Sequence, residues 1–213
     1  MEVKDKVMYH YHKKGIYDEL WGKGKEITVD NNFRSYYSTI LDFFTTGVQC
    51  QDDKVSSFDR VISYYLQDDI FKTIEKDLTK QLLLEAKKII TQTNVCRREF
   101  ALEKMRQNNY PDLPSRLHSI WLTDKENLDF WSKYLITDSK LKDEMLQLYE
   151  LNVTGNLFKS SDYYIPDDKL TMHEMMLQSI KYWNPEFDKD EALNGIEYLF
   201  QGKVKIIKRI ENI

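Results

Sequence analysis

The sequence contains only two cysteines, Cys50 and Cys96, and neither lies in a cysteine-rich motif. Two isolated cysteines cannot form the disulfide framework that stabilises small secreted domains, so we expect a reducing compartment. No apolar run approaches the roughly 18 residues of a membrane-spanning helix. Residues 1–15 (MEVKDKVMYHYHKKG) are also too charged to resemble a signal peptide. The sequence therefore predicts a cytoplasmic protein without a membrane segment.

Glycine and proline are scarce as well, with seven and four residues, and neither gathers in a low-complexity stretch. Without a flexible joint or a visible repeat, nothing in the sequence divides the chain, and we expect a single domain over residues 1–213. The formal net charge of −4 gives no general attraction to nucleic acid, although a local basic face can still exist. The phosphate-cradling motifs G-x-G-x-x-G and G-K-[ST] are absent.

Strand patterns are present at both ends of the chain. Residues 6–15 (KVMYHYHKKG) alternate so that Met8, His10 and His12 share one face. Further strands are expected at residues 26–30, 117–123 and 145–158. Residues 195–210 (GIEYLFQGKVKIIKRI) predict a final hairpin that turns at Gln201-Gly202. Its first strand carries Glu197 among apolar residues, and the ordinary interpretation is an exposed position on an edge strand, whose loss would hardly disturb the core.

Helical patterns fill the middle of the chain, and we expect residues 33–109 to be mostly helical. Residues 58–107 contain neither Gly nor Pro, and Leu78, Leu82 and Ala86 follow the spacing of an amphipathic helix. Residues 124–135 and 168–183 predict two later helices. Strands at both ends with helices between them predict an α+β fold, in which early and late strands pair at long range.

Three stretches resemble the diphtheria-toxin-like branch of the ADP-ribosyltransferases. Residues 9–15 (YHYHKKG) resemble the first strand of that fold, which carries a His. Residues 116–135 (RLHSIWLTDKENLDFWSKYL) resemble its next core strand and helix, and residues 147–165 followed by 195–207 resemble the later strands, the last of which carries a Glu. The order matches a His-Tyr-Glu active site. The chain is also similar to a bacterial family of uncharacterised proteins in which PSR precedes the central strand.

The resemblance implies an ADP-ribosyltransferase-like split β-sheet core with a helical insertion in the first half. It implies a mono-ADP-ribosyltransferase that uses NAD as a substrate and modifies a macromolecule, either a protein or a nucleic acid. A toxin or phage-conflict effector with an antitoxin or regulatory partner is one setting for such an enzyme. The catalytic residue that the resemblance implies is Glu197. The cofactor-binding residues that it implies are His10, Tyr11, Ser115, Arg116, Ser119 and Trp121.

These residue types suit the cleavage of the nicotinamide–ribose bond. A carboxylate at Glu197 would stabilise the oxocarbenium-like ribose of the transition state. His10 would donate a hydrogen bond to a ribose hydroxyl, and Arg116 would bind the pyrophosphate bidentately. Trp121 stands where the family usually has Tyr, so a ring for stacking on nicotinamide is kept and a hydroxyl is lost. An ordinary half-exposed strand His and a surface Arg are the structural alternatives.

Other interpretations of the same residues stay open. His10 and His12 have metal-ligand spacing, but no Cys or carboxylate of zinc-site spacing accompanies them, so we expect no metal. A catalytically silent domain that binds a nucleotide or a partner is favoured by the missing Tyr. A third hypothesis is a helical interaction protein, whose basic residues could meet a nucleic acid. These residues are Arg97, Arg98, Lys104 and Arg106.

Overall fold

The computed structural model describes residues 1–15, 18–43, 47–49, 55–67, 70, 76–137, 146–188 and 190–210. Strands and helices are both present, and the protein is α+β. Its internal contacts divide the chain into two compact units. The larger is formed by Met1–Ser38 together with Arg98–Ile213, and the smaller by Thr39–Arg97. The single domain over residues 1–213 stays a prediction.

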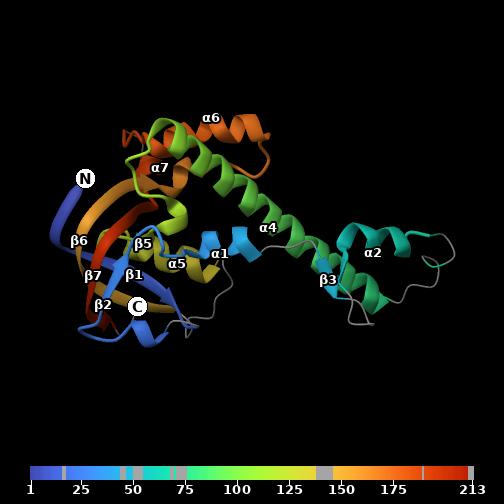
Figure 1. The fold of residues 1–213 in the computed structure, drawn as a ribbon, viewed down its shortest axis with the longest axis horizontal. Coiled ribbons are helices and arrows are strands. Elements are labelled where there is room, and N and C mark those ends of the chain that lie inside the picture. Colours follow the sequence, from blue (N-terminus) through green and yellow to red (C-terminus); the bar gives the residue numbers. More distant parts are fainter. Residues whose placement is uncertain are drawn as a thin grey trace. The chain divides into compact units, whose positions relative to one another are not determined.

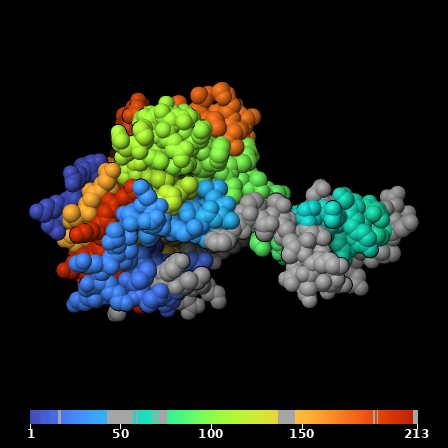
Figure 2. Space-filling model, in the orientation of Figure 1, coloured from blue at the N-terminus to red at the C-terminus, as the bar shows by residue number. Residues whose placement is uncertain are grey.

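The described part of the larger unit is built on one five-stranded antiparallel sheet (Figure 1). Its strands are β1 (Glu2–Lys13), β2 (Glu26–Val29), β5 (Ile120–Leu122), β6 (Leu146–Ser161) and β7 (Ile196–Ile210). The strand order is β1-β6-β7-β2, and β5 pairs with β7 as well. The long-range pairing of early and late strands is thereby confirmed, and blue N-terminal and red C-terminal atoms adjoin on the surface (Figure 2).

The last strand, β7, is one continuous strand, so the predicted hairpin at Gln201-Gly202 is wrong. Gly202 lies opposite Gly155 of β6, with φ angles of 145° and 154°. A Cβ on either glycine would collide with the backbone of the facing strand. The glycines therefore permit two long strands to approach closely rather than to turn. The predicted edge position is also wrong, because β7 pairs with β6 on one side and with β2 and β5 on the other.

The first strand is connected to the middle of the sheet by a second contact. Tyr9 of β1 and Thr123, which follows β5, exchange backbone hydrogen bonds of 2.9 and 2.8 Å. Since β5 pairs with β7, and β7 pairs with β6, the strands β1, β6, β7 and β5 form a closed circuit of neighbours. This circuit brings residues from the beginning, middle and end of the sequence together.

The predicted strand at residues 117–123 is shorter than expected. A short 3-10 helix, η2 (Arg116–His118), precedes β5, and the Ser115 hydroxyl caps it by accepting a hydrogen bond from the backbone N–H of Leu117. Because the cap favours a turn, the extended conformation begins only at Ile120. This turn directs Arg116 into the interior of the larger unit, where its side chain is almost fully buried.

Helices α5 (Leu128–Thr137), α6 (Met172–Trp183) and α7 (Asp190–Leu193) complete the larger unit, together with the end of α4 (Lys76–Asn109). A capping box formed by Thr171 and Glu174 begins α6, and Asn184 ends it. Trp183 donates a hydrogen bond to the backbone carbonyl of Leu102, which attaches α6 to α4 beside the sheet (Figure 1). Together these elements bury a second apolar cluster next to the core of the sheet.

The described part of the smaller unit contains helices and one small hairpin. The hairpin consists of β3 (Gly47–Gln49) and β4 (Val55–Ser57), and it was not predicted. Helix α1 (Tyr36–Phe43) crosses the boundary between the units, whereas α2 (Phe58–Tyr65) and most of α4 belong to the smaller one. The predicted stripe at Leu78, Leu82 and Ala86 is half-buried.

Among the described residues, no helix combines the length and the apolar character that crossing a membrane requires.

Candidate functional site

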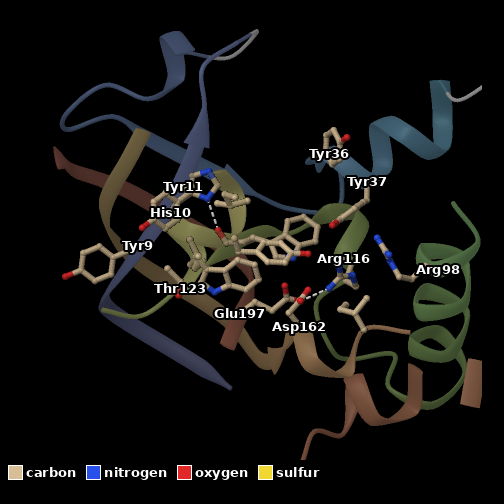
Figure 3. Close-up of a pocket in the computed structure, with 16 residues that line it drawn as sticks. Tyr9, His10, Tyr11, Tyr36, Tyr37, Arg98, Arg116, Thr123, Asp162 and Glu197 are labelled. Atoms are coloured by element: carbon tan, nitrogen blue, oxygen red, sulfur yellow. Dashed lines mark hydrogen bonds and ion pairs between the residues drawn. The ribbon is translucent and has the colours of Figure 1, made fainter. Parts of the chain in front are cut away.

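A cavity of about 440 Å³ lies at the strand circuit (Figure 3). All its lining residues belong to the larger unit. The aromatic residues of the lining are Tyr9, His10, Tyr11, Tyr36, Tyr37, Trp121, Trp131 and Tyr134. The charged ones are Arg98, Arg116, Asp162 and Glu197. The volume lies within the range of sites for small molecules, and aromatic walls with a few charged groups are typical of them.

The cavity brings together His10, Trp121 and Glu197, which stand on β1, β5 and β7. The strand circuit explains this, because β5 contacts both of the other strands. His10 Nδ1 lies 2.7 Å from the backbone carbonyl oxygen of Trp121 (Figure 3). A carbonyl oxygen can only accept a hydrogen bond, so Nδ1 carries the proton and donates it.

His10 is neutral at pH 7, because burial lowers its pKa to about 4, against the raising effect of the hydrogen bond to Trp121. The charge of His12 lowers the pKa further. With the proton on Nδ1, Nε2 of the neutral ring can only accept a hydrogen bond. A ligand group that bonds Nε2 would therefore have to donate, which is the reverse of the predicted donor role of His10. Trp21 stacks on both histidine rings, with centroid distances of 4.5 and 4.7 Å.

Glu197 is buried, with 5% of its surface exposed, so the predicted exposed position is wrong. Its Oε1 accepts a hydrogen bond of 2.6 Å from Arg116 Nη1 and a second, short one from the Tyr182 hydroxyl. On its other side, Arg116 donates to both carboxylate oxygens of Glu99 over 2.9 and 3.3 Å. The charge of Glu197 can be buried because Arg116 of η2 pairs with it and the Tyr182 hydroxyl of α6 donates to it.

The protonation states within this cluster follow from burial and charge. Burial alone would lower the pKa of Arg116, but Glu99, Tyr182 and Glu197 raise it well above its ordinary value. Burial raises the pKa of Tyr182 far above its usual range, and Glu197 raises it further although Arg116 opposes this. Arg116 thus remains charged and Tyr182 remains protonated, which is the state in which both donate to Glu197.

Two of the predicted cofactor-binding residues do not line the cavity. Ser115 caps η2 and donates a hydrogen bond of 2.9 Å to Glu103. Ser119 is fully buried, and its hydroxyl has no hydrogen-bond partner within the described part of the chain. Both serines flank the turn before β5 and do not line the cavity. The sequence motif could not distinguish residues of this turn from residues that face the cavity.

The other predicted cofactor-binding residues line the cavity in different ways. Tyr11 donates a hydrogen bond of 2.9 Å to the carbonyl of Leu128, and burial raises its pKa to about 12. Trp121 is half-buried, with the guanidinium of Arg116 5.3 Å from its ring centroid. Arg116 donates to Glu197 (Figure 3) and also to Glu99 and Tyr182. Its geometry therefore supports a role in holding carboxylates rather than the predicted pyrophosphate contact.

Sequence reasoning missed several residues of the site. Glu99 and Tyr182 are fully buried and hold Arg116. Glu99 follows Cys96 and precedes Leu102 at helical spacing, so it is a charge within an apolar stripe, just as Glu197 is in its strand. That pattern was a usable signal for a buried ion pair. Of the predicted basic cluster, Arg98 contacts Asp168, and Arg106 contacts Glu103 over 2.7 Å.

Among the described residues, no group of three His, Cys, Asp or Glu side chains lies close enough to hold a metal ion. His12 instead contacts Asp18, with 2.7 Å between Nε2 and Oδ1. Cys96 is half-buried on α4. Cys50 lies outside the described residues.

Comparison with protein families relates this geometry to a group of sequences. The family model described as "Protein of unknown function (DUF2441)" matches residues 8–212. The chain belongs to this family. The match extends from β1 to β7, so every cavity residue of this DUF2441 protein lies within it. No curated protein matches the chain.

Proposed function

We propose that this DUF2441 protein is an NAD-dependent mono-ADP-ribosyltransferase that modifies a macromolecular acceptor, a protein or a nucleic acid. The observation that carries the proposal is the convergence of His10 from the first strand and Glu197 from the last on one aromatic cavity. The sheet supports the split core of that fold, because β7 pairs with β5 along its first half and with β2 along its second.

The position of Glu197 suits the chemistry of the proposed reaction. Both hydrogen bonds that the structure gives its carboxylate go to Oε1, so Oε2 is the oxygen that we expect to face a bound ribose. Arg116 and Tyr182 fix the carboxylate before the ligand arrives, and a preorganised charge stabilises a cationic transition state without reorganisation. The ribose–nicotinamide bond breaks with its electron pair leaving on nicotinamide. The acceptor nucleophile then bonds to the anomeric carbon and releases a proton to water.

The aromatic lining suits the flat rings of the substrate. Trp121 and Tyr37 lie 5.2 Å apart at their centroids with an interplanar angle of 70°, and both line the cavity. Aromatic faces bind heterocycles by stacking. His10, neutral and fixed by its bond to the Trp121 carbonyl, would accept a hydrogen bond from a ribose hydroxyl.

The proposed setting is the cytoplasm, because the two cysteines are isolated and few. In this setting the enzyme would act as a toxin or phage-conflict effector by modifying a macromolecule. An effector of this kind endangers the cell that makes it, so an antitoxin or regulatory partner belongs to the proposal.

A catalytically silent domain that binds a nucleotide or a partner is the second candidate. One observation favours it: Arg116 lies 2.6 Å from Glu197 and offsets part of its charge. A carboxylate that is strongly paired stabilises a ribosyl cation less than a free one does. In this alternative the cavity binds its ligand and no bond breaks.

The test uses NAD labelled with ³²P in its adenylate phosphate. The purified protein is incubated with labelled NAD and cell lysate, and nicotinamide release and label in the protein and nucleic-acid fractions are measured. We expect label in one macromolecular fraction, at a level that Glu197→Gln strongly reduces. Binding of NAD without nicotinamide release would support the silent domain, and neither binding nor release at millimolar NAD would overturn both candidates.

A further inference from the structure

We propose that Arg98 is the anion-binding residue of the cavity, where it takes the phosphate groups of a ligand whose flat ring lies against the aromatic walls. The inference depends on the proposed function only in identifying these phosphates with the diphosphate of NAD. The chemical class, a nucleoside diphosphate or its ester, follows from the cavity itself.

Among the described residues, Arg98 and Arg116 are the guanidinium groups that line the cavity. It extends from α4 toward Tyr37 and lies beside Arg116 (Figure 3). Its side chain is 19% exposed, whereas that of Arg116 is 3% exposed. Arg98 is therefore the guanidinium that an entering ligand can reach.

The charge of Arg98 is weakly engaged in the structure. Its Nη1 donates a hydrogen bond of 3.3 Å to Asp168, and its Nε lies 3.9 Å from Glu99. This Nε is buried and has no hydrogen-bond partner among the described residues. Arg116, by contrast, makes bonds of 2.6 and 2.9 Å to Glu197 and Glu99. Arg116 is thus occupied by protein carboxylates, and Arg98 keeps donor capacity for a ligand.

The carboxylates near Arg98 leave room for an anion in the part of the cavity that Arg98 lines. Glu99 directs both oxygens to Arg116, and Asp168 is half exposed at 44%. A contact of 3.3 Å to an exposed carboxylate contributes little, so a phosphate can displace Asp168 from Arg98 at small cost. Phosphate and guanidinium then form short charge-assisted hydrogen bonds.

The placement also orients the ligand. In Figure 3, Arg116 lies between Arg98 and Glu197. Glu197 and Asp162 repel phosphates from the other part of the lining. With its diphosphate at Arg98, the same ligand would place its ribose near the carboxylate of Glu197, which can stabilise positive charge.

The test is calorimetric titration of the full chain with ADP-ribose, inorganic pyrophosphate and nicotinamide. We expect Arg98→Gln to weaken binding of the first two probes about 10- to 100-fold, because charge-assisted bonds are lost, and to leave nicotinamide binding unchanged. Arg98→Lys keeps the charge without the planar fork and should give an intermediate loss. Asp168→Asn removes the competing carboxylate and should strengthen pyrophosphate binding.

Lys104→Gln is the matched control, because it removes one positive charge from an exposed position of the same helix. It should change binding less than about twofold. Arg98→Gln binding both phosphate probes as tightly as wild type would overturn the inference, as would absence of pyrophosphate and ADP-ribose binding to wild type at millimolar concentration. Binding that depends on Arg98, without NAD consumption, would uphold the inference and reject the proposed enzyme activity. NAD consumption with an unchanged KM in Arg98→Gln would uphold the activity and reject the inference.

Discussion

Arg116 and Glu197 are 81 positions apart in the chain, and they form a buried ion pair of 2.6 Å at the wall of the cavity. The guanidinium is shared, since its other side binds Glu99 over 2.9 Å. Such a pair contributes little net stability, because both charges lose their hydration on folding. Its consequence is positional: Glu197 is held in one place by Arg116 and Tyr182, and cannot turn away from the cavity without breaking both bonds.

Glu197→Gln is the first prediction. We expect NAD consumption to fall about 10²–10³-fold, because the charge that would stabilise the ribosyl cation is lost. We also expect a loss of about 2–4 kcal/mol in the free energy of unfolding, since Arg116 keeps only Glu99 as a charged partner. From the sequence alone we expected a much smaller loss of stability, because Glu197 was interpreted as an exposed residue of an edge strand. The measurements are NAD turnover and urea unfolding of the same preparations.

Glu99→Gln is the control for this variant. It removes a carboxylate from the other side of the same guanidinium, but Glu99 does not line the cavity. The loss of stability should be similar, and the loss of NAD turnover should stay below about tenfold. Equal losses of turnover in both variants would mean that Glu197 acts only through the fold.

Tyr182→Phe is expected to destabilise the protein by about 1.5–3 kcal/mol. The Tyr182 hydroxyl accepts from Arg116 and donates to Glu197, and hydrogen bonds to charged groups are stronger than neutral ones. Tyr149→Phe is the matched control, because it removes a buried hydroxyl that bonds the neutral side chain of Gln147 over 2.7 Å. It should lose about 0.5–1.5 kcal/mol in chemical denaturation. The prediction fails if the two variants unfold at the same denaturant concentration.

Local patterns predicted most of the elements but not their neighbours. Alternation predicted β1 and β6, and the Gly/Pro-free stretch predicted α4. The error at Gly202 has a physical cause: Gln-Gly between two alternating runs suits a tight turn, and only its partner Gly155 on β6 shows that the glycine serves close strand packing. The pairing of early with late strands could be predicted in general, but the particular neighbours of each strand are not encoded in the local sequence.

Single residues of the candidate site could be predicted from the sequence, but their interaction partners could not. His10 and Glu197 could be placed because strand alternation and motif order brought them to one cavity. The partners of Glu197 were missed, because a charge on a helix or turn is usually solvated, and its burial depends on what the tertiary structure sets against it. Arg98 was treated as part of a basic helix surface for the same reason.

Gly202→Ala is expected to reduce the free energy of unfolding by at least about 2 kcal/mol. A Cβ at this position would meet the carbonyl oxygen of Thr154 at 2.5 Å, and φ is 145°. Gly24→Ala is the matched control, because φ is also positive, at 80°, but nothing lies within 4 Å of an added Cβ. It should lose about 1 kcal/mol. Urea unfolding measures both, and equal losses would show that β6 and β7 can separate to admit a methyl group.

The pH dependence of stability is expected to report the burial of His10. Its pKa is about 4 in the folded protein against an ordinary 6.5, so the unfolded chain binds more protons between these values. The contribution of His10 is therefore complete above pH 6.5, falls as the pH drops toward 4, and stays constant below that. The ring is only half-buried, so we expect a loss of about 2 kcal/mol across this window. When the free energy of unfolding, measured with urea, is plotted against pH between 4 and 7, its slope should be shallower for His10→Gln than for wild type. The substitution removes this titration, while all carboxylates still contribute. Parallel slopes, or an NMR titration in which the His10 ring takes up its proton near pH 6.5, would contradict the burial of the ring against the Trp121 carbonyl.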